Sequence, residues 1–135
     1  MASIYDDIRA ALETKLNSVS GVPSISWENL QFSPTTGQPY VKPRLLPTRR
    51  EPAVRGLNPQ MYYQGVFRVE CYVPEGNGPA AGDDLADKII DAFEAATDVS
   101  YGGTIVSIRY AERESADIDG PFYMIPVNIG WYIYA

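Results

Sequence analysis

Residues 62–73 alternate between apolar and polar side chains, and no other stretch constrains the fold as strongly. Successive side chains of a β-strand point to opposite faces, so this period of two predicts a strand with one buried face. The residues expected on the buried face are Phe67, Val69, Cys71 and Val73, and those expected on the other face are Arg68, Glu70 and Tyr72.

Three more strands are predicted over residues 39–46, 104–113 and 122–134. Prolines cannot donate to a ladder, so residues 39–46, with Pro39, Pro43 and Pro47 close by, are expected to form an edge or bulged strand. The side chains expected to share a face are Val106, Ile108 and Tyr110 in one strand and Tyr123, Ile125, Val127, Ile129, Trp131 and Ile133 in the last.

Two helices are predicted from apolar residues that recur at helical spacing. The first covers residues 3–19, starts with a capping box of Ser3 and Asp6, and ends before Gly21. The second follows residues 74–84, PEGNGPAAGDD. Its buried stripe is expected to contain Leu85, Ala86, Ile89, Ala92, Phe93 and Ala96, with Asp84, Asp87, Asp91 and Glu94 outside it.

The elements follow the order helix, strand, strand, helix, strand, strand. This order predicts a single α+β domain over residues 1–135, with two layers: a four-stranded, mostly antiparallel sheet packed with two helices. Residues 48–60, which include Arg49, Arg50 and Arg55, are expected to form an exposed, mobile loop.

The glycine-rich stretch at residues 74–84 is not expected to bind a phosphate. A phosphate loop places Lys and Ser or Thr after its last glycine, whereas here Asp83 and Asp84 follow Gly82. Carboxylates at a helix N-terminus complement its positive end and repel phosphate, so we expect the two aspartates to cap the helix.

The rest of the sequence contains no pattern of catalytic groups. The chain has no histidine, which removes Ser-His-Asp and Cys-His nucleophile pairs and most zinc sites. Cys71 is expected to be an inert buried thiol and, as a lone cysteine, suits a reducing compartment. We therefore predict a protein that is not an enzyme and that uses no cofactor or metal.

Neither export nor a membrane partner is expected. The first residues, MASIYDDIR, carry acids where a signal peptide carries bases, and the most apolar stretch, residues 122–135, is too short to span a bilayer.

Charge is divided along the chain, although its net value is −6. Residues 42–68 are mainly basic and residues 75–98 mainly acidic. Two solvated faces explain this as well as complementary patches on a self-associating protein do. The candidate patches are Arg49, Arg50 and Arg55 with the flanking Tyr62 and Tyr63 on one side, and Asp84, Asp87 and Asp91 on the other.

Tyrosines allow two interpretations as well. The residues Tyr62, Tyr63, Tyr72, Tyr132 and Tyr134 lie outside the buried stripes, which suits an interface as well as simple packing on a sheet.

The arginines at 49, 50 and 55 suit contact with DNA phosphates, but the overall acidity disfavours a dedicated DNA-binding protein. A loop that lines a channel through which DNA passes is still compatible with the sequence.

Two stretches resemble a known family. The run WENLQFSPTTGQPYV at residues 27–41, and FRVECYVPEGNGP at residues 67–79 followed by the helix DDLADKIIDAF, are similar to the tail terminator, or tail-completion, proteins of long-tailed bacteriophages, of the minor tail protein U group. The resemblance covers most of the chain, and its motifs are structural rather than catalytic.

This resemblance implies a structural virion protein. It would form a ring, usually hexameric, at the head-proximal end of the tail tube, where it stops polymerisation and joins the tail to the head. The implied partners are other copies, the tail tube protein and a head–tail connector or stopper, with assembly in the host cytoplasm and non-specific contact with DNA in the channel as a further option. The alternatives are another neck or tail protein, such as a stopper or tube subunit, and a small ligand-binding α+β module.

Overall fold

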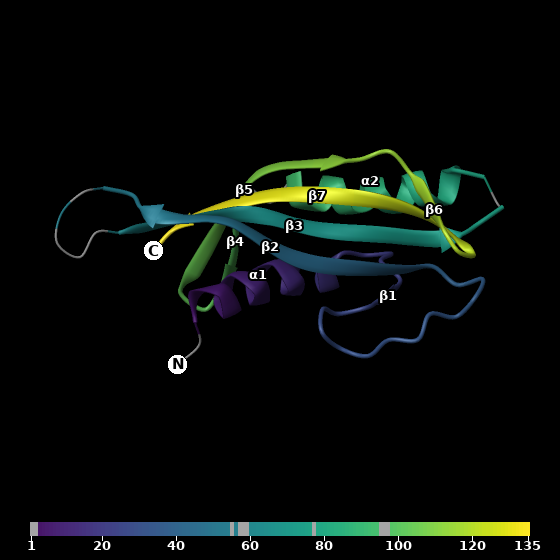
Figure 1. Cartoon of the computed structure of the whole chain (residues 1–135), viewed down its shortest axis with the longest axis horizontal. Coiled ribbons are helices and arrows are strands. Elements are labelled where there is room, and N and C mark those ends of the chain that lie inside the picture. Colours follow the sequence, from purple (N-terminus) through teal and green to yellow (C-terminus); the bar gives the residue numbers. More distant parts are fainter. Residues whose placement is uncertain (1–2, 55, 57–59, 77, 95–97) are drawn as a thin grey trace.

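In the described part of the chain, seven strands form one long, curved sheet and two helices pack against it (Figure 1). The computed structural model describes all residues except 1–2, 55, 57–59, 77 and 95–97. The predicted Ala96 of the second helix therefore lies outside the described residues. The elements are α1 (Ile4–Ser18), β1 (Ser24–Ile25), β2 (Tyr40–Pro52), β3 (Met61–Pro74), α2 (Ala80–Glu94), β4 (Asp98–Tyr101), β5 (Thr104–Arg113), β6 (Asp117–Asp119) and β7 (Phe122–Tyr134).

The sheet contains more strands than the four that the sequence predicts. Its order is β1-β2-β3-β7-β5-β4, with β6 paired to β7, and each pairing is antiparallel except that of β1 with β2. The mixed α+β class and the four long strands agree with the prediction, but the count of four is wrong. The strands that were missed, β1, β4 and β6, have two to four residues, which is too short for a periodic pattern to emerge.

Helix α1 begins as its sequence predicts. The Ser3 hydroxyl accepts a hydrogen bond from the Asp6 N–H, and the Asp6 carboxylate accepts one from the Ser3 N–H, both at 3.2 Å. This capping box satisfies N–H groups that no helix turn can reach. The side chains buried against the sheet are Ile8, Ala11, Leu12 and Leu16.

Helix α2 starts earlier than expected. Since it begins at Ala80, Asp83 lies in its first turn, and the prediction that Asp83 and Asp84 cap the helix is wrong in position. Asp83 instead accepts a hydrogen bond at 2.6 Å from Arg113 at the end of β5. Asp84, Asp87, Asp91 and Glu94 are exposed, as predicted.

No described helix is long and apolar enough to cross a membrane.

Strand β2 continues to Pro52, six residues beyond its predicted end, so residues 48–52 are strand rather than loop. A bulge between Pro47 and Arg49 shifts the pairing with β3 by one residue. The rest of the predicted loop includes positions 55 and 57–59, which are outside the described residues. Figure 1 shows the paired ends of β2 and β3 projecting beyond the rest of the sheet.

The prolines of β2 lie where its backbone points away from β3. The Val41 carbonyl accepts a hydrogen bond from the Ser26 N–H, and the Leu45 N–H donates one to the Glu28 carboxylate. The backbone N–H and C=O groups of alternate residues of β2 therefore point away from β3. Pro43 and Pro47 fall in this outward series, and Pro52 falls in it beyond the bulge. Because proline has no N–H, this side of β2 offers few donors to an added strand. The predicted bulge is confirmed, and β2 is an open edge only beyond Val41, since β1 pairs with Tyr40 and Val41.

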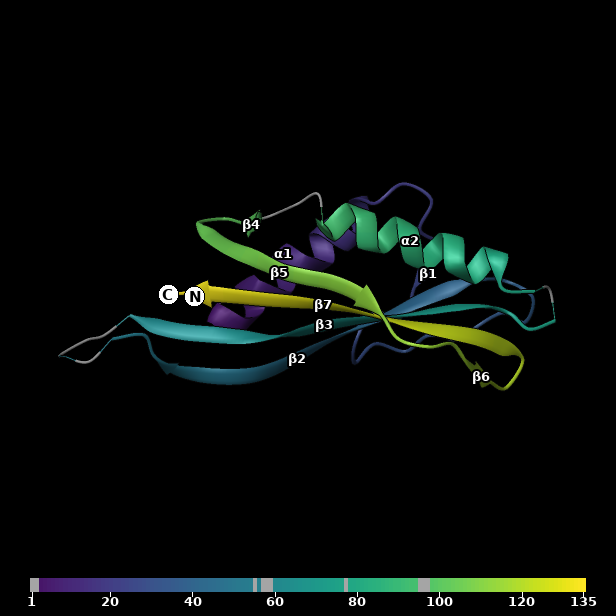
Figure 2. The same ribbon diagram turned by 90° about the horizontal axis from the view of Figure 1, so that it is seen from above.

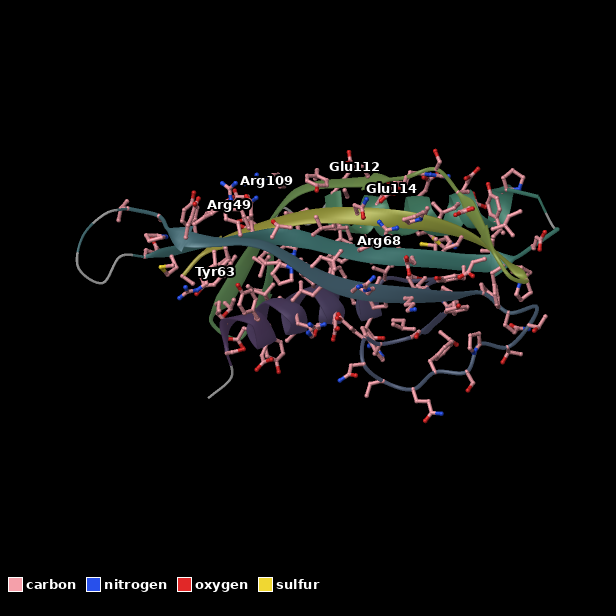
Figure 3. The ribbon with its side chains drawn as sticks, viewed as in Figure 1. Arg49, Tyr63, Arg68, Arg109, Glu112 and Glu114 are labelled. Carbon is pink, nitrogen blue, oxygen red and sulfur yellow. The ribbon has the colours of Figure 1, made fainter. Side chains whose placement is uncertain are left out.

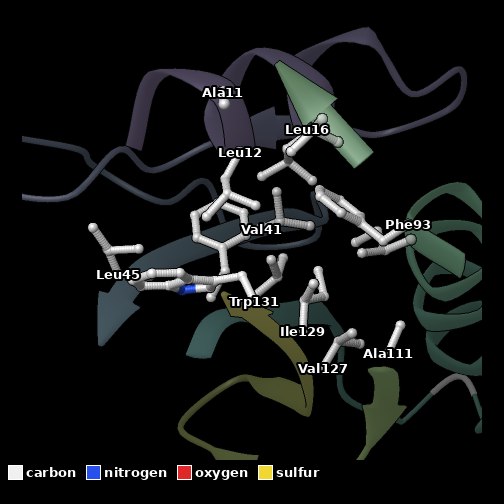
Figure 4. Close-up of a cluster of buried hydrophobic side chains, with 14 of the residues drawn as sticks. Ala11, Leu12, Leu16, Val41, Leu45, Phe93, Ala111, Val127, Ile129 and Trp131 are labelled. Atoms are coloured by element: carbon white, nitrogen blue, oxygen red, sulfur yellow. The ribbon is translucent and has the colours of Figure 1, made fainter. Parts of the chain in front are cut away.

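The main core lies between the helices and one face of the sheet, which we call the inner face (Figure 4). Both helices contribute to it, and Figure 2 shows them on the same side of β2 and β3. Its fully buried large side chains include Trp131, Phe67, Phe93 and Ile129. The faces predicted for residues 67–73 and 123–133 agree with this core, except that Tyr72 is also buried, on the opposite face.

Two tyrosine predictions are wrong. Tyr63 is 6% exposed and packs edge-to-face on Tyr5 in the core, so it lies inside a buried stripe. Tyr110 does not share a face with Val106 and Ile108, because a bulge between Ile108 and Tyr110 reverses the alternation. A single extra residue in a strand moves every later side chain to the other face.

An ion-pair junction fixes the segment between β1 and β2 to the rest of the domain. Arg9 of α1 lies 2.6 Å from Glu28 and 3.7 Å from Glu13, and Glu28 also accepts the Leu45 N–H at 3.0 Å. Burial acts to raise the pKa of Glu28, but the bonds from Arg9 and Leu45, together with the charges of Arg9 and Arg44, outweigh it and hold the pKa below its ordinary 4.5. Burial raises the pKa of Glu13.

We expect Glu28→Gln to lower the free energy of unfolding by about 1 kcal/mol at pH 7, because it removes the charge from a half-exposed pair. A carboxyl whose pKa is lowered by folding stabilises the protein above its unfolded pKa, and this contribution is lost as the pH falls through the folded pKa. Urea unfolding of both proteins should show the difference at pH 7 and its disappearance below the ordinary value of 4.5. Glu13 is common to both proteins, so its titration largely cancels. A difference that stays constant at low pH would contradict the argument.

Candidate assembly surface

The second face of the sheet, which we call the outer face, carries the even-numbered side chains of β3 and β7. The described helices contribute nothing to it, since their buried residues belong to the inner core. It holds aromatic side chains at both ends and charged side chains between them. A sheet face of this kind is available to another molecule.

Three tyrosines and one arginine form a cluster at the end of the outer face next to the projecting β2–β3 hairpin. We call Tyr62, Tyr132, Tyr134 and Arg109 the tyrosine–arginine cluster. The ring centroids of Tyr62 and Tyr134 are 5.0 Å apart, and those of Tyr132 and Tyr134 are 6.2 Å apart. Arg109 donates to the Tyr62 hydroxyl, and its guanidinium lies 5.1 Å from the centroid of the Tyr132 ring. Tyr62 donates in turn to Gln64.

The charged groups in the middle of the outer face neutralise one another. Arg68 lies 2.7 Å from Glu114 and 3.4 Å from Glu70, and Asn128 donates to Glu114 at 2.6 Å (Figure 3). The bond from Asn128 and the charge of Arg68 lower the pKa of Glu114. Arg68 belongs to the basic region that the sequence indicates, but its charge is already balanced within the chain.

The far end of the outer face is a small aromatic core. Tyr40 and Tyr72 stack at 4.4 Å with their rings nearly parallel, and Phe122 meets both edge-on. Burial raises the pKa of both tyrosines, and nearby carboxylates add to the effect. All three rings are at most 9% exposed, so this end stabilises the sheet and offers little surface.

Strand alternation places Arg49 and Arg50 on opposite faces, and the bulge before Arg49 decides which face each one takes. Arg49 pairs with Gln64 in the ladder and lies on the outer face at the same end as Arg109 (Figure 3). Arg50 pairs with Tyr63 and lies on the inner face. Arg50 lies 5.7 Å from the Tyr63 ring centroid. Of the five predicted residues, Arg49 and Tyr62 therefore share the outer face, Arg50 and Tyr63 do not, and Arg55 is outside the described residues.

The predicted acidic residues lie on the opposite side of the domain. Asp84, Asp87 and Asp91 are exposed on α2, whose buried stripe faces the sheet, so their side chains point away from the sheet. Glu94 extends this set, which we call the acidic face of α2. Within the described residues none of these four carboxylates has a basic group within 4.0 Å.

Arg109 was missed from the sequence. It lies outside the basic region at residues 42–68, in a predicted strand that also contains Arg113, and nothing local distinguishes it from a solvated strand residue. The pairing of β5 with β7 and of β7 with β3 brings it to Tyr62, which is 47 positions away in the chain. Only the register of the sheet reveals this contact.

Cys71 is fully buried, as the sequence predicts, and burial raises the pKa of its thiol to about 12. The thiolate is the reactive form of cysteine, so we expect no reaction of the folded protein with an aromatic disulfide reagent at pH 8. One thiol per chain should react once urea unfolds the protein. Rapid reaction of the native protein would contradict the burial of this strand.

Solved structures share this fold. One, which carries no functional description, has a TM-score of 0.77 and 21% sequence identity, and the match covers 99% of this chain and 97% of the other. Another is a chain from the virion of a native gene transfer agent particle, with a TM-score of 0.66 and 12% identity over the full length of both chains. No curated protein sequence matches the chain.

The fold is a small two-layer α+β domain whose helices leave one face of the sheet uncovered. The chain belongs to the phage tail terminator protein family, whose sequence model matches residues 7–131. It is thus a structural component of a phage tail, and the resemblance drawn from residues 27–41 and 67–79 is confirmed.

Proposed function

We propose that the protein closes the head-proximal end of the tail tube as a ring, stops the polymerisation of the tube and offers the surface to which the head attaches. The ring, usually a hexamer in this family, assembles in the host cytoplasm and becomes part of the virion. Its partners are other copies of itself, the tail tube protein and a head–tail connector or stopper protein.

Membership of the tail terminator family over nearly the whole chain is the observation that supports this function best. The structure adds two supporting features. The outer face leaves an aromatic and basic surface uncovered, and the acidic face of α2 lies on the other side of the domain. A ring needs two different patches on each subunit, because each copy meets its neighbours on either side through different surfaces.

The test is negative-stain imaging of the purified protein, alone and mixed with tail tubes that are still able to grow. We expect closed rings at one end of each tube and no further growth at that end. Tubes that lengthen normally in its presence would overturn the proposal. The protein without tubes is a weaker test, since the tube end can be the template for the ring.

Three alternatives predict different images. A tube subunit would polymerise into long cylinders by itself, and a head–tail stopper would bind the head side without affecting tube growth. A small ligand-binding module would stay monomeric with and without tubes. The hollow of about 920 Å³ beside α1 gives that last option little support, because its lining residues Arg9, Glu13 and Glu28 are already engaged with one another.

A further inference from the structure

We propose that the tyrosine–arginine cluster, together with Arg49, is the docking site for the acidic face of α2 of a second copy of the chain. This inference rests on the proposed ring and assigns its subunit contact to particular residues. It differs from the pairing that the sequence suggests, because Arg50 lies on the inner face and Arg109 takes its place.

The basic half of the contact is held in position before any partner arrives. Arg109 is fixed by its hydrogen bond to Tyr62 and by its position over the Tyr132 ring. Among the described carboxylates none lies within 4.0 Å of Arg109, so its charge is available. Arg49 lies 3.5 Å from Glu51, but both side chains are about half exposed, and an exposed pair of this kind is weak enough for Arg49 to exchange partners. A pre-positioned guanidinium loses less entropy on binding than a mobile one, and tyrosine and arginine are both enriched at interfaces.

The acidic half lies on a helix that is anchored to the core. Helix α2 is anchored to the core through Ile89 and Phe93, both fully buried. Asp84, Asp87 and Asp91 are exposed on it, one helical turn apart, and Lys88 is the only base in the helix. Such a row of like charges is stabilised when an opposite charge is placed beside it.

The arrangement of the two surfaces favours a second copy over other occupants. The outer face and the acidic face of α2 lie on opposite sides of the two-layer domain, so one copy can meet the next in a head-to-tail manner. Strand addition at β2 is disfavoured by its outward-facing prolines and by the bond from Leu45 to Glu28. Complementary charge therefore favours side-chain contact between the outer face and the acidic face of α2.

The experiment compares charge reversals that keep the chain otherwise intact. Arg49→Glu with Arg109→Glu reverses the basic half, and Asp87→Lys with Asp91→Lys reverses the acidic half. Lys42→Glu with Arg44→Glu is the matched control, since it makes the same change of charge on the outer face away from the cluster. Thermal unfolding of each variant checks that the monomer still folds.

Ring formation on tail tubes and subunit association in native mass measurements are the readouts. We expect each reversal to weaken association at least about tenfold, the control to stay within about threefold of wild type, and the four-fold variant that carries both reversals to regain most of the loss. Recovery in the combined variant is the decisive result, because a general loss of solubility or folding would not be reversed by a second reversal.

The outcomes distinguish the two proposals. If the wild-type protein forms no ring on tubes, the proposed function is wrong and the proposed subunit contact is wrong as well. If rings form and the reversal of Arg49 and Arg109 behaves like the control, only the contact is wrong. If that reversal abolishes binding to a short DNA duplex and leaves association unchanged, the cluster faces DNA in the channel, and this too overturns the contact.

Discussion

Gly65→Ala should be the most destabilising conservative change in the sheet, with a loss of about 3 kcal/mol in the free energy of unfolding. A methyl group at this position would lie 2.6 Å from Cζ2 of Trp131, 2.6 Å from the Leu46 carbonyl oxygen and 2.9 Å from Cα of Pro47. Two of these three atoms are backbone and cannot rotate away. Urea unfolding should show a lower midpoint with an unchanged slope.

Gly130→Ala is the matched control, since it makes the same change in the neighbouring central strand. The added methyl group would meet the ring of Tyr110, which lies on the outer face and is 38% exposed. That ring can move into solvent, so we expect a loss below about 1 kcal/mol. Equal losses at the two glycines would contradict the packing of β2, β3 and β7 described above.

A double variant tests how much of the strain in Gly65→Ala comes from the Trp131 ring and how much from the backbone of β2. Trp131→Phe removes the Cζ2 atom and also a buried indole N–H that has no hydrogen-bond partner among the described residues. In the Gly65→Ala background this change should recover about 1 kcal/mol, whereas the contact with the Leu46 carbonyl keeps the variant below wild type. Full recovery would mean that the indole alone prevents a side chain at this position.

Phe93→Ala should produce the second large effect, a loss of about 3–5 kcal/mol. Phe93 is fully buried, and its ring centroid lies 6.1 Å from that of Phe67. It is the last large apolar side chain of α2 in the described chain, and it fixes the helix to β3. Calorimetry should show a fall of about 10 °C or more in Tm, because each kcal/mol shifts the Tm of a domain of this size by several degrees.

Ile105→Ala is the control for this second prediction. Ile105 is also a large apolar side chain, but it is 57% exposed on β5, so we expect a change within about 0.5 kcal/mol. Because Phe93 positions the helix that carries Asp87 and Asp91, the Phe93→Ala variant should also assemble poorly. A variant that melts early but associates normally would show that α2 is not the docking helix.

Local sequence patterns were sufficient for the long elements. The alternation at residues 62–73 and the helical stripe of Ile8, Leu12 and Leu16 predicted their elements with the correct buried faces. Each depends on side chains that are close in the chain, and a period of two or of 3.6 needs only about ten residues to be evident. The capping box of Ser3 and Asp6 is local for the same reason.

Other features depend on pairing between distant segments. Strands β1, β4 and β6 form because they pair with longer neighbouring strands. Strand β2 tolerates its prolines because the backbone nitrogen of each one points away from β3. The bulges in β2 and β5 decide that Arg50 lies on the inner face, where it remains exposed, and that Tyr110 lies on the outer face. A bulge is visible only when both strands of a pair are known.

The sequence by itself determined the α+β class, the two helices, the four long strands and the division of charge, since these follow from the order and spacing of residue types along the chain. The tertiary structure alone decided which charges share a surface, because sheet register brings Arg109 to Tyr62 and the bulge before Arg49 puts Arg49, rather than Arg50, on the outer face. Side chains that are distant in sequence meet only after backbone hydrogen bonds have fixed the register, and no local pattern encodes that pairing.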